Sequence, residues 1–396
     1  MLRLHDPRLR DGNTPAPEPL PEPLPLATLE GFFKDPAKAL LKDHLQLSLD
    51  ALDDVARLAE DEPMDAISPI HAVARTVFLQ QVLPRKCGDP AWTWDRQPPA
   101  WVRLGGLLPL GAAGDAAWAK EADAVDALWS RADASGRFDA RGQHGGQAVR
   151  VDVPLLLPGD AGVGDGVPQR VTGLLRNVFP LNGSADGVQI VFPFPNPIDE
   201  RKHLKEPGDL GFKERVPAFL HWALLRLQRA GTESPTPVRL TLLAAGEPDL
   251  AAQVNAWDLR YCATDAAGRA AMDADLRRRL RALVVLMRMG REGRSWFHPK
   301  TGWVACQELA QGADAAALAK RARAAWVKDF GEGRGERDYA PGYAQLLEGD
   351  LVFGDPDTDP DSRALRALLQ DAQAIHGLIM LGDGDPIPAN ASQEAA

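Results

Sequence analysis

Cysteine and long apolar runs are the features that this sequence most clearly lacks. Its 396 residues include three cysteines, Cys87, Cys262 and Cys306, which are far apart and form no Cys-x-x-Cys pair. Neither a disulfide framework nor a zinc knuckle is therefore predicted. No apolar run reaches the roughly 20 residues that cross a membrane, and residues 1–14 are polar and charged rather than signal-like. We expect a cytoplasmic protein without membrane contact.

Positive charge is also in short supply. Lysine and arginine total 45 against 55 aspartate and glutamate, which gives a net charge of −10. A free-standing module held on DNA by bulk charge needs a basic surface, so that class is excluded and any DNA contact would use local basic strips. The sequence contains no Gly-x-x-x-x-Gly-Lys-Ser/Thr motif and no His-Glu-x-x-His motif, so we expect no nucleotide cofactor and no metal site.

Proline alternates with small, acidic or leucine residues over 14–25, TPAPEPLPEPLP. Because proline lacks a backbone donor and favours polyproline II, we expect this run to be a spacer. The predicted organisation is an N-terminal remnant and linker at 1–25, one folded domain at 26–381 and a flexible tail at 382–396. Within the domain we expect helices over 26–135, a sheet core over 136–245 and helices over 246–381.

Hydrophobic periodicity changes along the chain and predicts a mixed α/β fold. Pro36 is expected to break the first helix in two, and the turn 183–187 is expected to connect a hairpin. The predicted helices cover 28–41, 50–59, 69–82, 115–132, 216–230, 272–290, 314–330 and 362–379, and the predicted strands cover 148–156, 169–179, 188–194 and 238–244. The fold class is therefore a small central sheet flanked by helices.

Four stretches of the sequence form a distinctive series: LATLEGFFKDPAKALLKDHLQLSL (26–49), EDEPMDAISPIHAVARTVFLQQVL (60–83), RLGGLLPLGAAGDAAWAKEADAVDALWSR (103–131) and FLHWALLRL (219–227). The third carries a Gly-x-Leu-Pro-x-Gly-x-x-Gly pattern that opens a helix, and a Pro- and aromatic-rich loop, GREGRSWFHPKTGWVA (290–305), follows the fourth. In their order and spacing these stretches resemble the C-terminal domain of the RecC family, the gamma subunit of exodeoxyribonuclease V (RecBCD).

The resemblance implies a core related to the PD-(D/E)xK nucleases, whose carboxylates hold a divalent metal and whose lysine stabilises developing charge. Placed on that pattern, the strand 171–179 carries Arg176 where an acid is expected. Phe192 and Phe194 then fall at the next acid and at the lysine. Since a cation and two phenyl rings cannot bind magnesium, we expect an inactive nuclease-like core with no catalytic residue.

The function implied by the resemblance is that of a non-catalytic subunit in double-strand break repair and homologous recombination. Such a subunit holds RecB-type and RecD-type partners together and guides DNA, from double-stranded ends to unwound single strands. We expect no enzymatic activity from this chain alone. Recognition of the Chi sequence belongs to the helicase-like portion of the family, which this sequence lacks, and is not assigned to these residues.

Three basic clusters are candidates for contact with DNA phosphates, and an aromatic ring beside one of them, Trp326, is a candidate for base stacking. The alternative is that each is an ordinary charged surface exposed to water. The clusters are Arg201, Lys202 and Lys205; Arg277, Arg278 and Arg281; and Lys320, Arg321 and Arg323.

Two other interpretations stay open. The chain would be an active metal-dependent DNA exonuclease if its carboxylates are misplaced by our alignment, and it would be an unrelated protein-interaction domain if the order of the stretches is coincidence. The carboxylates available to an active site are Glu62, Asp65, Asp115, Glu121, Asp152 and Asp186.

Overall fold

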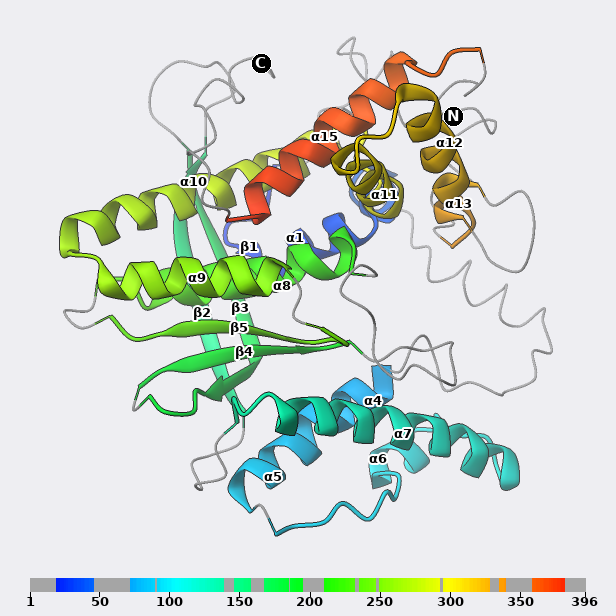
Figure 1. Cartoon of the computed structure of the whole chain (residues 1–396), viewed down its shortest axis with the longest axis vertical. Helices are drawn as coiled ribbons and strands as arrows, with labels where there is room; N and C mark the ends of the chain where they lie inside the picture. Colours follow the sequence, from blue (N-terminus) through cyan, green and yellow to red (C-terminus); the bar gives the residue numbers. More distant parts are fainter. Residues whose placement is uncertain are drawn as a thin grey trace.

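The computed structural model describes a mixed α/β fold in which helices lie on both sides of one sheet (Figure 1). The described residues are 19–45, 72–89, 91–138, 146–157, 167–184, 186–194, 210–231, 235–246, 249–292, 295–327, 335–339 and 358–381. The predicted helix at 50–59, the basic cluster at 201–205 and the tail at 382–396 lie outside them.

The sheet contains the four predicted strands and one more. Strands β2 (Gln147–Leu157), β3 (Val167–Pro180) and β4 (Val188–Pro193) run antiparallel in sequence order, and β5 (Val238–Leu243) pairs parallel with β4. The predicted turn 183–187 lies in the connection from β3 to β4, so the expected hairpin order is confirmed.

The additional strand, β1 (Leu24–Pro25), comes from the end of the proline-rich run and pairs parallel with β3. Leu24 is fully buried, and the Gln169 amide donates to the Pro21 carbonyl oxygen at 3.0 Å. Proline is tolerated in a short edge strand because its fixed φ is compatible with extended backbone. The sequence analysis assigned these two residues to the spacer, whereas in the structure they form the edge strand β1.

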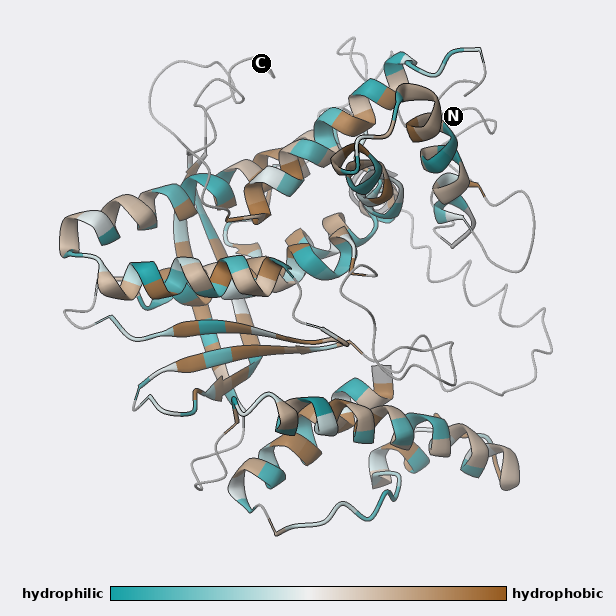
Figure 2. Cartoon of the chain, in the orientation of Figure 1, coloured by the Kyte–Doolittle hydropathy of each residue, from teal (hydrophilic) through white to brown (hydrophobic). Residues whose placement is uncertain are grey.

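The main core lies between one face of the sheet and helices α1 (Leu26–Lys34), α8 (Phe212–Gln228), α9 (Asp249–Ala263) and α10 (Ala266–Arg291). In Figure 2 the strands β4 and β5 show brown, apolar residues along their length. Pro36 separates α1 from α2 (Pro36–Leu45), as predicted. Helix α9 was not predicted, although Leu250, Val254, Trp257 and Tyr261 recur on its buried side.

A second helical layer covers the opposite face of the sheet (Figure 1). It consists of the continuous helical stretch α4 (Ala72–Val77), η3 (Phe78–Val82) and α5 (Leu83–Gly88), followed by α6 (Ala100–Leu104) and α7 (Ala112–Ala134). Its core is closed by one apolar residue from each of three strands: Phe179, Val191 and Leu243.

A third group packs α2 against α11 (Pro299–Ala310), α12 (Ala315–Trp326) and α15 (Arg363–Ile379), with the short α13 (Glu336–Tyr339) beside them. The stretch 290–305 was predicted to be a loop, but its second half is the start of α11. Proline is favoured at the first helical position, and the buried Glu336 carboxylate accepts from the backbone amides of Lys300 and Thr301. The acid therefore caps this helix, which the local sequence does not reveal.

An aromatic junction joins α1 to the segment before α11. The rings of Phe33 and Phe297 are 5.7 Å apart, and those of Phe297 and Phe212 are 5.5 Å apart. Phe32 lies so close to α10 that a Cβ on Gly290 would meet its ring at 2.1 Å. The stretches 26–49 and 290–305, which carry much of the family resemblance, thus meet in the core.

We expect Gly290→Ala to lower the free energy of unfolding by about 1–3 kcal/mol, because the rigid Phe32 ring has to move out of its packed position. The matched control is Gly31→Ala in α1, where a Cβ meets nothing within 4 Å. That change should raise stability by about 0.5–1 kcal/mol through helix propensity. Urea unfolding of both variants measures the difference, and equal effects would mean that the Phe32 contact is not tight.

Candidate functional site

The strand that carries Arg176 contains a β-bulge at this position. Gln147 pairs with Val178 and Val149 with Leu175, so Arg176 and Asn177 together oppose one residue of β2. Before the bulge, Leu175 enters the main core while Arg176 is exposed. After it, Val178 faces the main core and Phe179 the second layer. An extra residue of this kind re-aims the side chains of a strand and is frequent beside functional sites.

The two phenylalanines of the nuclease pattern face the main core. Phe194 is buried in this core and Phe192 packs against the core from its edge. The two rings are stacked, with their centroids 6.4 Å apart. Phe192 also contacts the His221 ring of α8, at 5.1 Å. The exposed Arg176 lies on the other face of the sheet, because it follows the core residue Leu175. The structure therefore does not bring the three positions together.

A polar pair borders Phe192 on the core side. His221 Nε2 and the Glu30 carboxylate form an ion pair that joins α8 to α1, and both side chains are largely buried. Burial by itself raises the pKa of the Glu30 carboxyl, but the hydrogen bond with His221 and the charges of His221 and Lys34 outweigh it, so the pKa is lowered. Sequence reasoning missed Glu30, since no local pattern pairs it with a histidine 191 residues away.

The carboxylates considered for an active nuclease are dispersed over separate elements where the structure describes them. Asp115 is exposed in the first turn of α7, and Asp186 is exposed between β3 and β4. Glu121 is buried and accepts from the Ala74 amide at 2.8 Å, while Asp152 binds the Arg170 guanidinium. Among the described residues no three His, Cys, Asp or Glu side chains gather as a metal-holding group. Glu62 and Asp65 lie outside that part of the chain.

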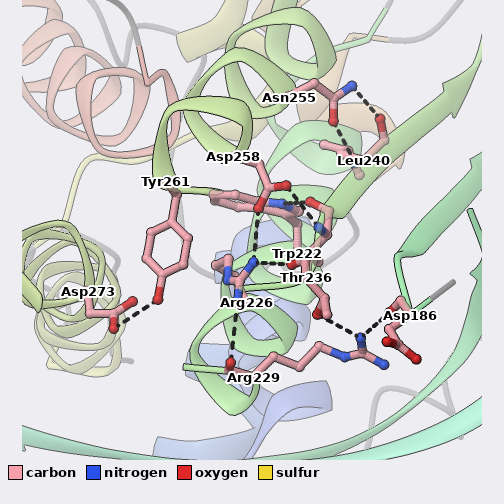
Figure 3. Close-up of polar contacts among 11 residues, drawn as sticks. Asp186, Trp222, Arg226, Arg229, Thr236, Leu240, Asn255, Asp258, Tyr261 and Asp273 are labelled. Carbon is pink, nitrogen blue, oxygen red and sulfur yellow. Dashed lines mark hydrogen bonds and ion pairs between the residues drawn. The ribbon is translucent and has the colours of Figure 1, made fainter. Parts of the chain in front are cut away.

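The outer edge of β5 is closed by side chains of α8 and α9 (Figure 3). The Asn255 amide both accepts from the Leu240 amide at 2.9 Å and donates to the Leu240 carbonyl at 3.0 Å. The Val238 amide donates to Asp258 at 2.9 Å, and its carbonyl accepts from Trp222 at 2.7 Å. These bonds replace those of a further strand, so this edge does not offer a template for strand addition.

The acid of that edge, Asp258, belongs to a buried ion pair. Arg226 donates to its carboxylate at 3.2 Å and to the Thr236 carbonyl at 2.7 Å, with the guanidinium 4.3 Å above the Tyr261 ring (Figure 3). Burial raises the pKa of the Asp258 carboxyl, against the hydrogen bond from Val238 and the charge of Arg226. Both side chains are buried, and the terminal nitrogens of Arg226 are held by Asp258 and by the backbone carbonyls of Thr236 and Arg229, so the role of the pair is structural.

The basic cluster at 277–281 lies on α10, where its side chains contact other parts of the fold. Arg278 binds Asp275, and the buried Arg279 next to it donates to the Gly377 carbonyl at 2.8 Å, at the carboxyl end of α15. Arg277 and Arg281 are half-buried on the same helix. This placement favours the structural interpretation of the cluster over contact with DNA.

The cluster at 320–323 lies on α12. Lys320 and Arg321 are exposed, Arg323 is half-buried, and Arg321 reaches Glu308 at 3.5 Å. Trp326 is fully buried, its ring 4.8 Å from that of His298. The prediction that Trp326 stacks on DNA bases is therefore wrong: its ring closes the core between α11, α12 and α15.

The loop between α6 and α7, here called the signature loop (Gly105–Gly111), presents apolar side chains to solvent. Leu110 is 98% exposed, and Leu104 just before the loop is 87% exposed. Gly111 has φ +70°, and a Cβ on Gly114 would meet the Pro109 carbonyl oxygen at 2.0 Å. The glycine pattern thus supports a tight loop in which Leu108 packs against the second core, while Leu107 and Leu110 stay exposed.

Acid titration tests the Glu30–His221 contact. A carboxyl whose pKa is lowered in the folded state contributes stability above its ordinary pKa of 4.5, and this is lost as pH falls through the lowered pKa. We expect the free energy of unfolding to fall more steeply for the wild type than for Glu30→Gln between about pH 5 and pH 3. Asp359→Asn, at an exposed position, should keep the wild-type slope; parallel slopes for wild type and Glu30→Gln would contradict the contact.

Removing the acid at the β5 edge should be costly. Asp258→Ala leaves Arg226 buried without its counter-ion, and we expect a loss of about 3–5 kcal/mol in the free energy of unfolding. Leu259→Ala changes the next residue of the same helix, which is 68% exposed, and should change stability by less than about 0.5 kcal/mol. Denaturant titration measures both free energies of unfolding. A loss below about 1 kcal/mol for Asp258→Ala would mean that water reaches Arg226 in the variant, so that no unpaired charge stays buried.

Comparison with known proteins supports the resemblance seen in the sequence. A family model described as the RecC C-terminal domain matches residues 21–310, well over half of the chain. No curated protein gives a significant match. Within the described residues, no helix combines the length and apolar character needed to cross a membrane. The matched range begins within the proline-rich run, a few residues before β1, and includes all five strands, the signature loop and the aromatic junction. The chain belongs to the family of RecC C-terminal domains.

Proposed function

We propose that this chain acts as the non-catalytic C-terminal part of a RecC-like subunit of the RecBCD helicase–nuclease. In this role it docks RecB-type and RecD-type subunits and guides unwound DNA during double-strand break repair and homologous recombination. The observation that carries the proposal is the family match over residues 21–310, because the family implies a multi-subunit complex. Because this role requires access to DNA inside the cell, the proposed location is the cytoplasm.

The signature loop supports a docking role. Apolar side chains that a fold holds outside its own core are typical of protein–protein contact sites. Leu104 and Leu110 are the most exposed large apolar residues of the described chain, and Trp101 and Leu107 nearby are partly exposed. We propose that a partner subunit covers these four side chains.

The absence of catalysis is supported by the chemistry of the aligned positions. Phe192 and Phe194 contribute to the core rather than to a solvent-filled site, and Arg176 is a cation. An active metal-dependent exonuclease remains the second candidate, and no grouping of the described carboxylates favours it. The hairpin order of β3 and β4 is present, so the observation that would favour an unrelated interaction domain is not met.

The test is retention of partner subunits by the purified chain, with linear DNA and magnesium in a parallel reaction without partners. We expect the RecB-type or RecD-type subunit from the same source to be retained and the DNA to stay intact. Leu104→Ser/Leu110→Ser should reduce retention at least about tenfold, as expected for the loss of a central apolar contact. Leu259→Ser, a matched change on α9, should leave retention unchanged.

Magnesium-dependent degradation of DNA by the chain alone would contradict the non-catalytic proposal. Failure to retain either subunit would contradict the docking proposal. Equal retention by Leu104→Ser/Leu110→Ser and Leu259→Ser would mean that docking uses another surface than the signature loop.

A further inference from the structure

The outer face of the β2–β3 pair, on the side away from the main core, carries two exposed arginines. Arg150 lies directly opposite Leu174 in the strand register, and Arg176 follows Leu174 by two residues on β3. Side chains two residues apart share a face of a strand. Arg150 and Arg176 are therefore diagonal neighbours around Leu174, within reach of one ligand for side chains as long as arginine.

This pair differs from Arg170, the remaining arginine of β2 and β3. Arg170, further along β3, is held by Asp152 through its Nε at 2.9 Å, and its backbone amide donates to Glu22. The guanidinium groups of Arg150 and Arg176 have no hydrogen bond or ion pair to any residue that the structure describes. Like charges placed as neighbours on a sheet repel, so the arrangement lowers stability unless an anion lies between them. It occurs in a chain with ten more acids than bases, 55 against 45.

We propose that Arg150 and Arg176 bind the phosphodiester backbone of a single strand of DNA and hold it without cutting it. The inference rests on the proposed DNA-guiding function and supplies residues for it. Arginine donates charge-assisted, often bidentate hydrogen bonds to phosphate oxygens. Leu174, 50% exposed between the two, offers an apolar contact for the sugar and base of an unpaired nucleotide, which a duplex keeps in its stack.

The position of Arg176 explains why such a face would hold DNA rather than cleave it. In the nuclease pattern this position carries a carboxylate, which reaches phosphate only through a bound divalent cation. A guanidinium at the same place contacts the phosphate directly. The bulge at Arg176 and Asn177 keeps this side chain on the solvent face, while Phe192 and Phe194 fill the core on the other.

The test is binding of a fluorescent oligothymidylate to the full chain, measured by anisotropy over a range of salt concentrations. We expect Arg150→Gln/Arg176→Gln to weaken binding about tenfold or more, as for the loss of two charge-assisted hydrogen bonds. The slope of log affinity against log salt should fall by roughly 1.4, because each single-strand phosphate contact contributes about 0.7. Thermal unfolding of the variant should occur at the wild-type temperature or slightly above it, because both side chains are exposed and the substitutions remove their mutual repulsion.

The matched control is Arg363→Gln/Arg366→Gln, which removes the same charge from exposed positions of α15 and should change affinity by less than about twofold. Lys320→Gln/Arg321→Gln tests the cluster on α12 that the sequence indicated. Unchanged binding by Arg150→Gln/Arg176→Gln, or an equal loss in either of the other two variants, overturns the proposal. A duplex that binds as tightly as the single strand and responds equally to the variant overturns the preference for unpaired DNA.

Partner retention by Arg150→Gln/Arg176→Gln separates this inference from the proposed function. Normal retention together with unchanged DNA binding refutes the arginine pair and leaves the docking role intact. Loss of DNA binding in the variant, with no partner retained even by the wild type, supports the pair and refutes the docking role.

Discussion

The extra residue that β3 accommodates between Leu175 and Val178 determines how the sheet divides its side chains. Up to Leu175, alternate residues enter the main core and the rest face solvent. From Asn177 onward, both faces are covered, because Phe179 reaches the second helical layer and Val178 the main core. The first part of β3 therefore has one face open to solvent, whereas its last part lies between two helical layers. The exposed position of Arg176 follows from this change of pattern.

Charge in this acidic chain is used in two different ways. Several arginines have partners within the fold: Arg226 lies over the Tyr261 ring and binds Asp258, and Arg279 donates to the end of α15. Their backbone and carboxylate partners leave no capacity for phosphate. Arg150 and Arg176 instead extend into solvent from the face of β2 and β3 that lies away from the main core. A basic motif in the sequence therefore says less about DNA contact than the partners that the fold provides for each cation.

Local signals in the sequence predicted the regular elements well. Alternating apolar residues specify β2 to β5, and Pro36 ends α1 because it cannot continue the backbone ladder. What the sequence did not reveal depends on contacts between distant segments. The pairing of Leu24 with Val171, the cap that Glu336 places on α11 and the Glu30–His221 ion pair all join residues that no local pattern relates. The candidate site shows the same limit. Arg176 lies on β3 and Phe192 on β4, as predicted, and Phe194 directly follows β4. The bulge that puts Arg176 on the opposite face from the two phenylalanines appears only in the strand register.

The central claim is that Arg176 and Phe194 lie on opposite faces of the sheet, one in solvent and one in the core. Thiol labelling under native conditions tests it most directly, with Arg176→Cys and Phe194→Cys each introduced where Cys87, Cys262 and Cys306 have been replaced by alanine. The account predicts that a thiol at position 176 reacts as fast as in the unfolded chain. The thiol at position 194 should react at least about a hundredfold more slowly, because its exposure requires local unfolding. Similar rates at both positions would contradict the account, since they would mean that the two strands present these side chains to a common, solvent-filled site.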